Sequence, residues 1–205
     1  MVNRQGYLLP EDGFAPVSRA AAVGWGVAYA AFMLYARAST SGFLFLDNAN
    51  LMIHEVGHTV FSWVGYYTMI LGGTLLQILV PLACTLFFVR KGQTTAVACT
   101  AFWGFENLLY IATYMGDARR SALPLVGGDE SDWTILFTHW GILQHDLTVA
   151  AWTRGVGWIG MLGTVVWLVY MHVTSEEIQP ASRIPMSPTI DTRRAPGITN
   201  RSQRP

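Results

Sequence analysis

The sequence contains few charged residues. Only 13% of its 205 residues are Asp, Glu, Lys or Arg, whereas 52% are hydrophobic. An ordinary soluble domain has about a quarter of its residues charged. The basic and acidic side chains also cancel, which gives a net charge of zero with the histidines neutral. Such a chain offers no basic surface for nucleic acid, and its composition indicates a protein of the lipid bilayer.

Cysteine and histidine are also scarce. Cys84 and Cys99 lie in separate apolar runs without CxxC spacing. They are therefore interpreted as small apolar side chains, which give no information on the redox compartment. The five histidines are too few for the membrane di-iron hydroxylases and desaturases, which need many clustered histidines.

Long apolar runs make up most of the sequence. A helix needs about 20 mostly apolar residues to cross a bilayer. Five runs come close to or exceed this length: 20–37, 43–65, 68–89, 94–116 and 151–173. Between the last two, Trp133, Leu136, Trp140 and Leu143 recur at helical spacing, which favours an interfacial or re-entrant helix. We expect an all-α polytopic transmembrane helix bundle with about five spans and this additional helix.

The chain is divided into three parts by composition. Residues 1–19 form an N-terminal segment, 20–173 the transmembrane domain, and 174–205 a polar tail that we expect to be disordered. The first apolar run is interpreted as a retained span, because acids and prolines precede it. With five spans, the distribution of Lys and Arg predicts an outside N-terminus and a cytoplasmic tail in a bacterial-type plasma membrane. If residues 132–148 also crossed the membrane, the number of spans would be even, and the two ends of the chain would lie on the same side.

The most informative motif is HEVGH at residues 54–58. On a helix, HExxH places His54 and His58 one turn apart on one face, where both can bind one Zn²⁺ ion. Glu55 can then act as the general base toward a water molecule that the metal activates. The sequence therefore predicts a zinc site with Glu55 as its catalytic residue.

The position of this motif strengthens the metal hypothesis. All three side chains lie near the middle of the second apolar run, where an ionised group costs roughly 3 kcal/mol. A divalent cation would offset the cost of burying these three polar side chains. The alternative is a buried hydrogen-bond network without catalysis. Asp47 and Asn50 lie on the histidine face of the same helix, and we assign them supporting or packing roles rather than ligation.

A catalytic zinc site needs a third protein ligand. Glu106 and Asp117 are eleven residues apart in the fourth run, about 16 Å along a helix, so only one of them can reach the histidines. We predict that Asp117 is the third ligand, because good helix formers extend the helix to about Leu123, before Pro124. If the helix ended near residue 115, Glu106 would match the histidines instead. The remaining candidates, left out of the ligand set, are His139, His145 and Asp146.

On these residues the chain resembles the membrane-embedded zinc metallopeptidases of the site-2 protease class, as a divergent branch. The resemblance covers residues 43–128 and depends on HEVGH, on the glycine pair and amide of GGTLLQILVP at 72–81, and on an acid from a later helix. It implies that His54, His58 and an aspartate bind zinc, with Glu55 as the base. Asp117 corresponds to the zinc-binding aspartate of the family only in residue type and in its order along the chain, because the NPxxxxLDG-type pattern of the family is missing. No inserted PDZ-like domain is present either.

The resemblance implies an intramembrane zinc-dependent peptidase that hydrolyses peptide bonds in or near the membrane. Its partners would be the lipid bilayer and a membrane-protein or peptide substrate. The alternative is a noncatalytic integral membrane protein, in which the same residues form a structural metal site or a buried polar network.

Overall fold

The computed structural model describes residues 10, 13–126 and 130–182. Within these residues the chain folds into helices without any strand, which confirms the predicted all-α class. The elements are α1 (Arg19–Ala38), α2 (Asp47–Phe61), α3 (Tyr66–Arg90), α4 (Thr94–Asp117), α5 (Asp132–His139), the short 3₁₀ turn η1 (Leu143–His145) and α6 (Asp146–Ser182).

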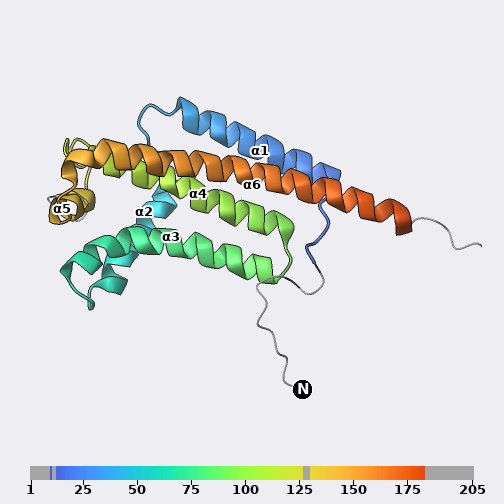
Figure 1. Cartoon of the computed structure of the whole chain (residues 1–205), viewed down its shortest axis with the longest axis horizontal. Coiled ribbons are helices and arrows are strands. Elements are labelled where there is room, and N and C mark those ends of the chain that lie inside the picture. Colours follow the sequence, from blue (N-terminus) through green and yellow to red (C-terminus); the bar gives the residue numbers. More distant parts are fainter. Residues whose placement is uncertain (1–9, 11–12, 127–129, 183–205) are drawn as a thin grey trace, which may run out of the picture.

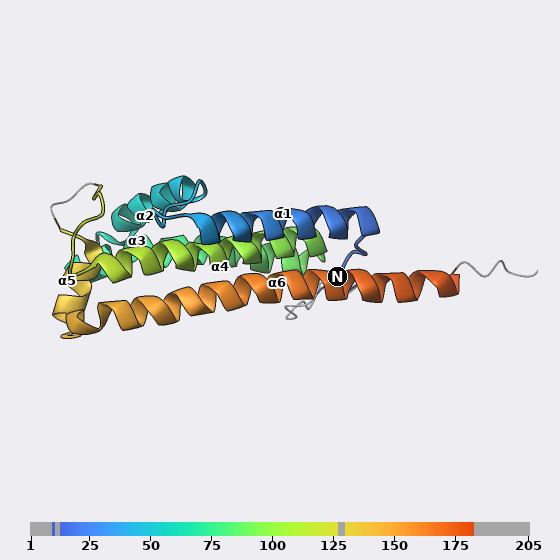
Figure 2. The same ribbon diagram turned by 90° about the horizontal axis from the view of Figure 1, so that it is seen from above.

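The long helices α1, α3, α4 and α6 all run along the long axis of the molecule, and α5 lies at one end (Figure 1). The longest, α6, packs along α4, and α1 lies against them (Figure 2). One core cluster joins these three helices, with Tyr29 of α1 stacked on Phe102 of α4 at 4.4 Å between ring centroids. A second cluster packs Trp133, Leu136 and Phe137 of α5 against α3, α4 and α6.

Two of the described helical segments are long and apolar enough to cross a membrane, namely α3 and the segment Leu143–Ser175. The predicted span at 43–65 is different, because α2 has only 15 residues. That length is about 22 Å, short of the roughly 30 Å hydrocarbon core. The chain turns at Ser62–Gly65, where Gly65 has φ 144°, and α3 then runs back along α2. The five-span bundle is therefore not confirmed.

The remaining boundaries differ in detail from those expected. The segment expected to lie at the interface is α5, followed by η1 and the start of α6. The last helix extends from Asp146 to Ser182, so it includes residues 174–182, which were expected to belong to the polar tail. The rest of that tail and most of the N-terminal segment lie outside the described residues.

Candidate metal centre

The two histidines of HEVGH lie together on α2 as the helical spacing requires. Their ring centroids are 4.7 Å apart, with the ring planes at 84° to each other. The carboxylate of Glu55 belongs to the same group, since one ligand atom each from His54, Glu55 and His58 lie within 4.8 Å of one another. These three residues could hold a metal ion.

The acid that faces both rings is Asp132, the first residue of α5. Its Oδ2 lies 2.8 Å from Nε2 of His54 and 3.2 Å from Nε2 of His58. Burial acts to raise the pKa of Asp132, but hydrogen bonding to the two histidines lowers it below the ordinary value. An ionised carboxylate therefore stands between the imidazoles. Sequence reasoning did not identify this residue.

The orientation of the His58 ring is fixed by α3. Its Nδ1 lies 2.9 Å from the main-chain carbonyl oxygen of Met69. A carbonyl oxygen can only accept, so Nδ1 of His58 must carry a hydrogen and donate it. In the neutral ring this leaves Nε2 with a lone pair, directed at Asp132.

The His54 ring is fixed in the same way by a chain of amides. Nδ2 of Asn107 donates to the main-chain oxygen of Gln77 at 2.6 Å, which identifies Oδ1 of Asn107 as an acceptor. Nε2 of Gln77 donates to that Oδ1 at 2.7 Å, so Oε1 of Gln77 is the atom 2.9 Å from Nδ1 of His54. Nδ1 of His54 therefore donates, and its Nε2 is also left as an acceptor in the neutral ring.

Both Nε2 lone pairs thus point at one carboxylate oxygen. Acceptors facing each other repel, so the arrangement needs either protons on the rings or a cation among the three atoms. Ligating histidines commonly donate their other ring nitrogen to a carbonyl group, which orients the ring and raises its basicity as a ligand. The hydrogen bonds to Met69 and Gln77 have this form.

The donor set fits zinc. Two imidazole nitrogens and one carboxylate oxygen, with a fourth position free, make up a common catalytic zinc set. At zinc–ligand distances near 2.0–2.1 Å, ligand atoms of a tetrahedral site are separated by about 3.3 Å. The observed separations of 2.8 and 3.2 Å require an outward movement of the aspartate of about half an ångström or less.

Close contact between α2 and α3 makes this geometry possible. A Cβ on Gly57 would stand 2.3 Å from the carbonyl oxygen of Gly72, so only glycine allows the two backbones to approach this closely. A Cβ on Gly73 would stand 2.7 Å from two atoms of the His54 ring. The glycine pair at 72–73 thus provides the space in which His54 lies.

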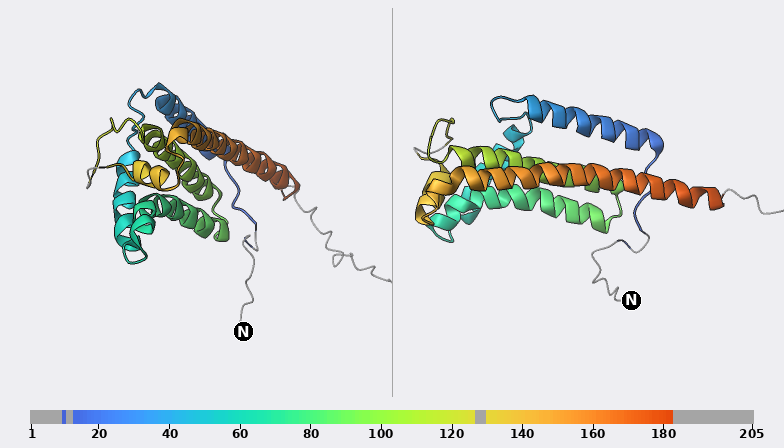
Figure 3. Two further views of the ribbon diagram at one scale, coloured as in Figure 1. Left: turned by 60° about the vertical axis from the view of Figure 1, so that its left-hand side comes forward. Right: turned by 45° about the horizontal axis from the view of Figure 1, so that its top comes forward.

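A cavity of about 60 Å³ adjoins the three convergent side chains, with room for only a few water molecules. Its wall comes from α2, α3 and α4, from residues 125–126 and from residues 130–133. Helix α5 lies between the start of α3 and the end of α4 (Figure 3). The lining residues besides the two histidines and Asp132 include Glu55, Thr74, Tyr110, Tyr114, Leu125 and Val126.

The structure does not bring Asp117 to the histidines. Helix α4 ends at Asp117 instead of continuing to Leu123. Oδ2 of Asp117 accepts hydrogen bonds from the backbone N–H groups of Ala122 and Leu123, at 2.9 and 2.8 Å. The carboxylate therefore stabilises the turn that follows the helix and does not line the cavity.

Glu106, the other acid of that helix, lies in a separate buried cluster. Nδ2 of Asn50 donates both to Oε2 of Glu106 at 3.2 Å and to Oδ1 of Asp47 at 3.0 Å. Nε1 of Trp103 donates to Oδ1 of Asn50 at 2.8 Å. Asp47 and Asn50 thus link α2 to α4, in agreement with the supporting role expected for them.

The other residues considered have contacts of their own. The ring of His139 stacks on Tyr67 with 3.5 Å between centroids, which joins the end of α5 to the start of α3. The buried Asp146 accepts from Nε of Arg119 at 2.8 Å. His145 lies in the turn η1. None of the three lines the cavity.

Comparison with protein-family models, curated proteins and solved structures finds no match to this chain.

Proposed function

We propose that the chain is a zinc-dependent peptidase that hydrolyses peptide bonds in or near the membrane. One observation supports this above the others. Both ring Nδ1 atoms donate to carbonyl-type oxygens, and both Nε2 atoms converge on the carboxylate of Asp132 beside Glu55. This arrangement holds two imidazole nitrogens and one carboxylate oxygen where a cation can take the place of ring protons.

In this proposal zinc is held by Nε2 of His54, Nε2 of His58 and Oδ2 of Asp132. When bound, zinc polarises a carbonyl group and lowers the pKa of a water molecule. Glu55 is not a ligand. Its carboxylate takes a proton from the attacking water and later gives that proton to the leaving amine.

The cavity favours an extended substrate. A space of about 60 Å³ admits a peptide carbonyl and a few water molecules but not a helix, whose diameter with side chains is about 10–12 Å. A helical membrane segment would therefore have to unwind locally before cleavage. Leu125 and Val126 give the cavity an apolar side, which suits residues of a membrane segment.

The test compares wild type with Glu55→Gln, which keeps the shape of the side chain but removes the base. We expect the variant to retain zinc and its thermal stability while losing hydrolysis of a fluorogenic peptide library in detergent micelles. Glu130→Gln, at the rim of the same cavity, is the matched control and should keep its activity. If Glu55→Gln lowers stability and wild type shows zinc but no hydrolysis, the noncatalytic structural site is the better interpretation.

A further inference from the structure

Arg154 is an unusual residue in its helix. It is the only Lys or Arg between residues 143 and 175, a segment apolar enough to span a membrane. A cationic side chain within a span costs roughly 3 kcal/mol and normally marks a functional position with an anionic partner. Asp146, the other charged residue of the segment, is already paired with Arg119 at 2.7 Å.

The described part of the chain provides Arg154 with no acidic partner. Its Nη2 donates to the hydroxyl of Thr113 at 3.2 Å, and the described ion pairs all involve other residues. One hydroxyl leaves most of the five guanidinium N–H donors without a protein acceptor.

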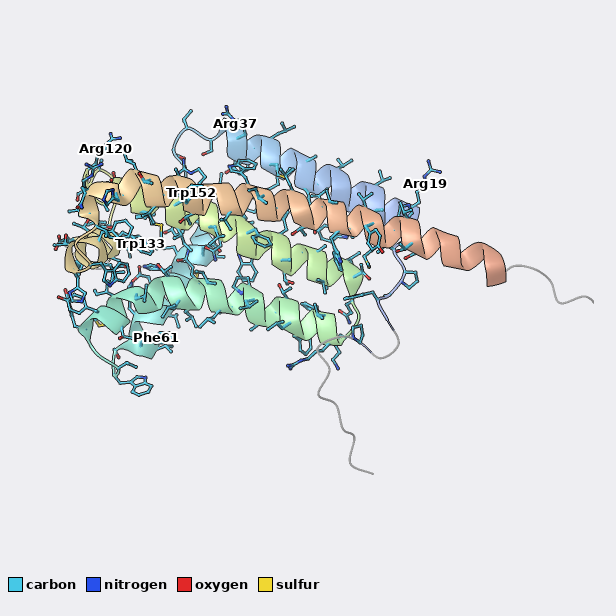
Figure 4. The ribbon with its side chains drawn as sticks, in the orientation of Figure 1. Arg19, Arg37, Phe61, Arg120, Trp133 and Trp152 are labelled. Atoms are coloured by element: carbon cyan, nitrogen blue, oxygen red, sulfur yellow. The ribbon has the colours of Figure 1, made fainter. Side chains whose placement is uncertain are left out.

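Two further arginines line the space around Arg154. A hollow of about 580 Å³ between α4 and α6 has Arg120 on its wall. A second hollow of about 330 Å³, at the end of α1, has Arg37 on its wall. Arg154 and Thr113 line both hollows, so Arg154 stands between the other two. Figure 4 shows Arg37 and Arg120 in the same half of the molecule, with Arg19 in the opposite half.

We call Arg37, Arg120 and Arg154, together with the walls of the two hollows, the arginine groove. The rest of its lining is largely apolar. Ala112, Ala150 and Leu109 contribute to its lining. One acid, Asp117, lies on the wall, and its Oδ2 already accepts two backbone hydrogen bonds. Three cationic groups against one carboxylate leave the groove positively charged.

The groove lies near the start of α6, toward one end of the candidate span. Arg154 follows the start of α6 by eight residues, about 12 Å of helix. Trp152, which is 74% exposed, precedes Arg154 by two residues on the same helix, and tryptophan is enriched where headgroups meet hydrocarbon. Guanidinium groups match phosphate oxygens in geometry and charge.

We propose that the arginine groove binds the phosphate group of an anionic phospholipid, with Arg154 as the central contact and the apolar walls against the glycerol and upper acyl chain. The three arginines and the unmatched positive charge support a phosphate ligand. The apolar lining and the position on a candidate span favour a lipid rather than a free phosphate. The proposal does not depend on the zinc site.

The test measures thermal unfolding of the purified full chain in neutral detergent, with added phosphatidylglycerol, phosphatidylcholine or inorganic phosphate. We expect phosphatidylglycerol to raise the melting temperature of wild type well above the effect of the other two. Arg154→Gln should weaken this response about tenfold in lipid concentration. Arg19→Gln, at the far end of the molecule, is the matched control and should respond as wild type does.

Native mass spectrometry of wild type provides a second measurement if Arg154→Gln folds poorly. The proposal is supported if the protein retains an anionic phospholipid that added phosphatidylglycerol displaces and added phosphatidylcholine does not. An equal response to both lipids, or an unchanged response in a folded Arg154→Gln, overturns it. Stabilisation by inorganic phosphate alone, lost in Arg154→Gln, overturns the lipid assignment.

Discussion

The imidazole of His54 lies directly against the Cα of Gly73, where a side-chain carbon would stand 2.7 Å from ring atoms Cε1 and Nε2. Gly73→Ala should therefore displace the ring from Asp132. We expect zinc affinity to fall by about tenfold or more, because small displacements of a ligand or its support have effects of this size. Competition with a chelator measures the change. Gly163→Ala, with nothing within 4 Å of the added carbon, is the control; similar losses in both variants would contradict the steric explanation.

Gln77 accepts the Nδ1 hydrogen of His54 and also donates to Asn107. Gln77→Leu removes both bonds, whereas Gln77→Glu keeps an acceptor for the ring. We expect Gln77→Leu to lose zinc affinity by about 10- to 100-fold and Gln77→Glu to retain most of it. Both variants should be less stable, because Oδ1 of Asn107 loses its donor. Equal zinc affinities in the two variants would show that the ring hydrogen bond does not control binding.

Asp47 and Glu106 are fully buried, and both accept a hydrogen bond from Nδ2 of Asn50. No described cation forms an ion pair with either, and two adjacent buried carboxylates cannot both ionise at low cost. Oε1 of Glu106 has no described hydrogen-bond partner, so we expect Glu106 to be the protonated acid of the two.

Glu106→Gln imitates the protonated acid. The variant should shift the free energy of unfolding by no more than about 1 kcal/mol and should leave the zinc content unchanged. Asp47→Asn should cost more, because it weakens the acceptor for the N–H of Leu44. Thermal unfolding in detergent gives the comparison. A large loss of stability or of zinc in Glu106→Gln would contradict this assignment.

The direction of the helices predicts the membrane topology. The two candidate spans, α3 and α6, run toward the same end of the molecule, so α4 between them must bring the chain back (Figure 1). The start of α1 lies at that same end, and α2 is too short to cross. The start of α1 and the end of α6 should therefore share one side, together with Arg90 and Lys91. This replaces the opposite sides expected from five spans.

The positive-inside rule makes that side cytoplasmic. Single cysteines at Lys91→Cys and Arg120→Cys, in a chain without Cys84 and Cys99, would test the assignment. A membrane-impermeant maleimide applied to intact cells should label position 120 and not position 91. The reverse pattern, or labelling of both positions, would contradict it.

Relationships within one helix could be predicted from the sequence, because the helical repeat determines them. His54, Glu55 and His58 lie together for this reason, and so do Asp47 and Asn50 on the face of α2 that meets α4. The short length of α2 was less evident, since the apolar run continues through the turn. Gly65, with φ 144°, is the residue that could have indicated it.

The partner acid could not be predicted in the same way, because it depends on how a connection folds back. Two features end α4 early: Ser121 adopts φ 47°, and the carboxylate of Asp117 accepts backbone N–H groups that a continued helix would have used. The chain can then place α5 over the histidines. A usable signal was Asp132 at the start of an amphipathic turn, ahead of Trp133 and Leu136, a position that favours an acid.

Zinc content, measured side by side in wild type, Asp132→Asn and Asp117→Asn, shows whether Asp132 is the acid that binds the metal. Asp132→Asn keeps the size of the side chain but removes the charge that faces both Nε2 atoms, whereas Asp117→Asn changes an acid that contacts only backbone N–H groups. We predict about one zinc ion per chain in wild type and in Asp117→Asn, and far less in Asp132→Asn. Zinc-free wild-type protein, or full zinc content in a folded Asp132→Asn, would contradict the account.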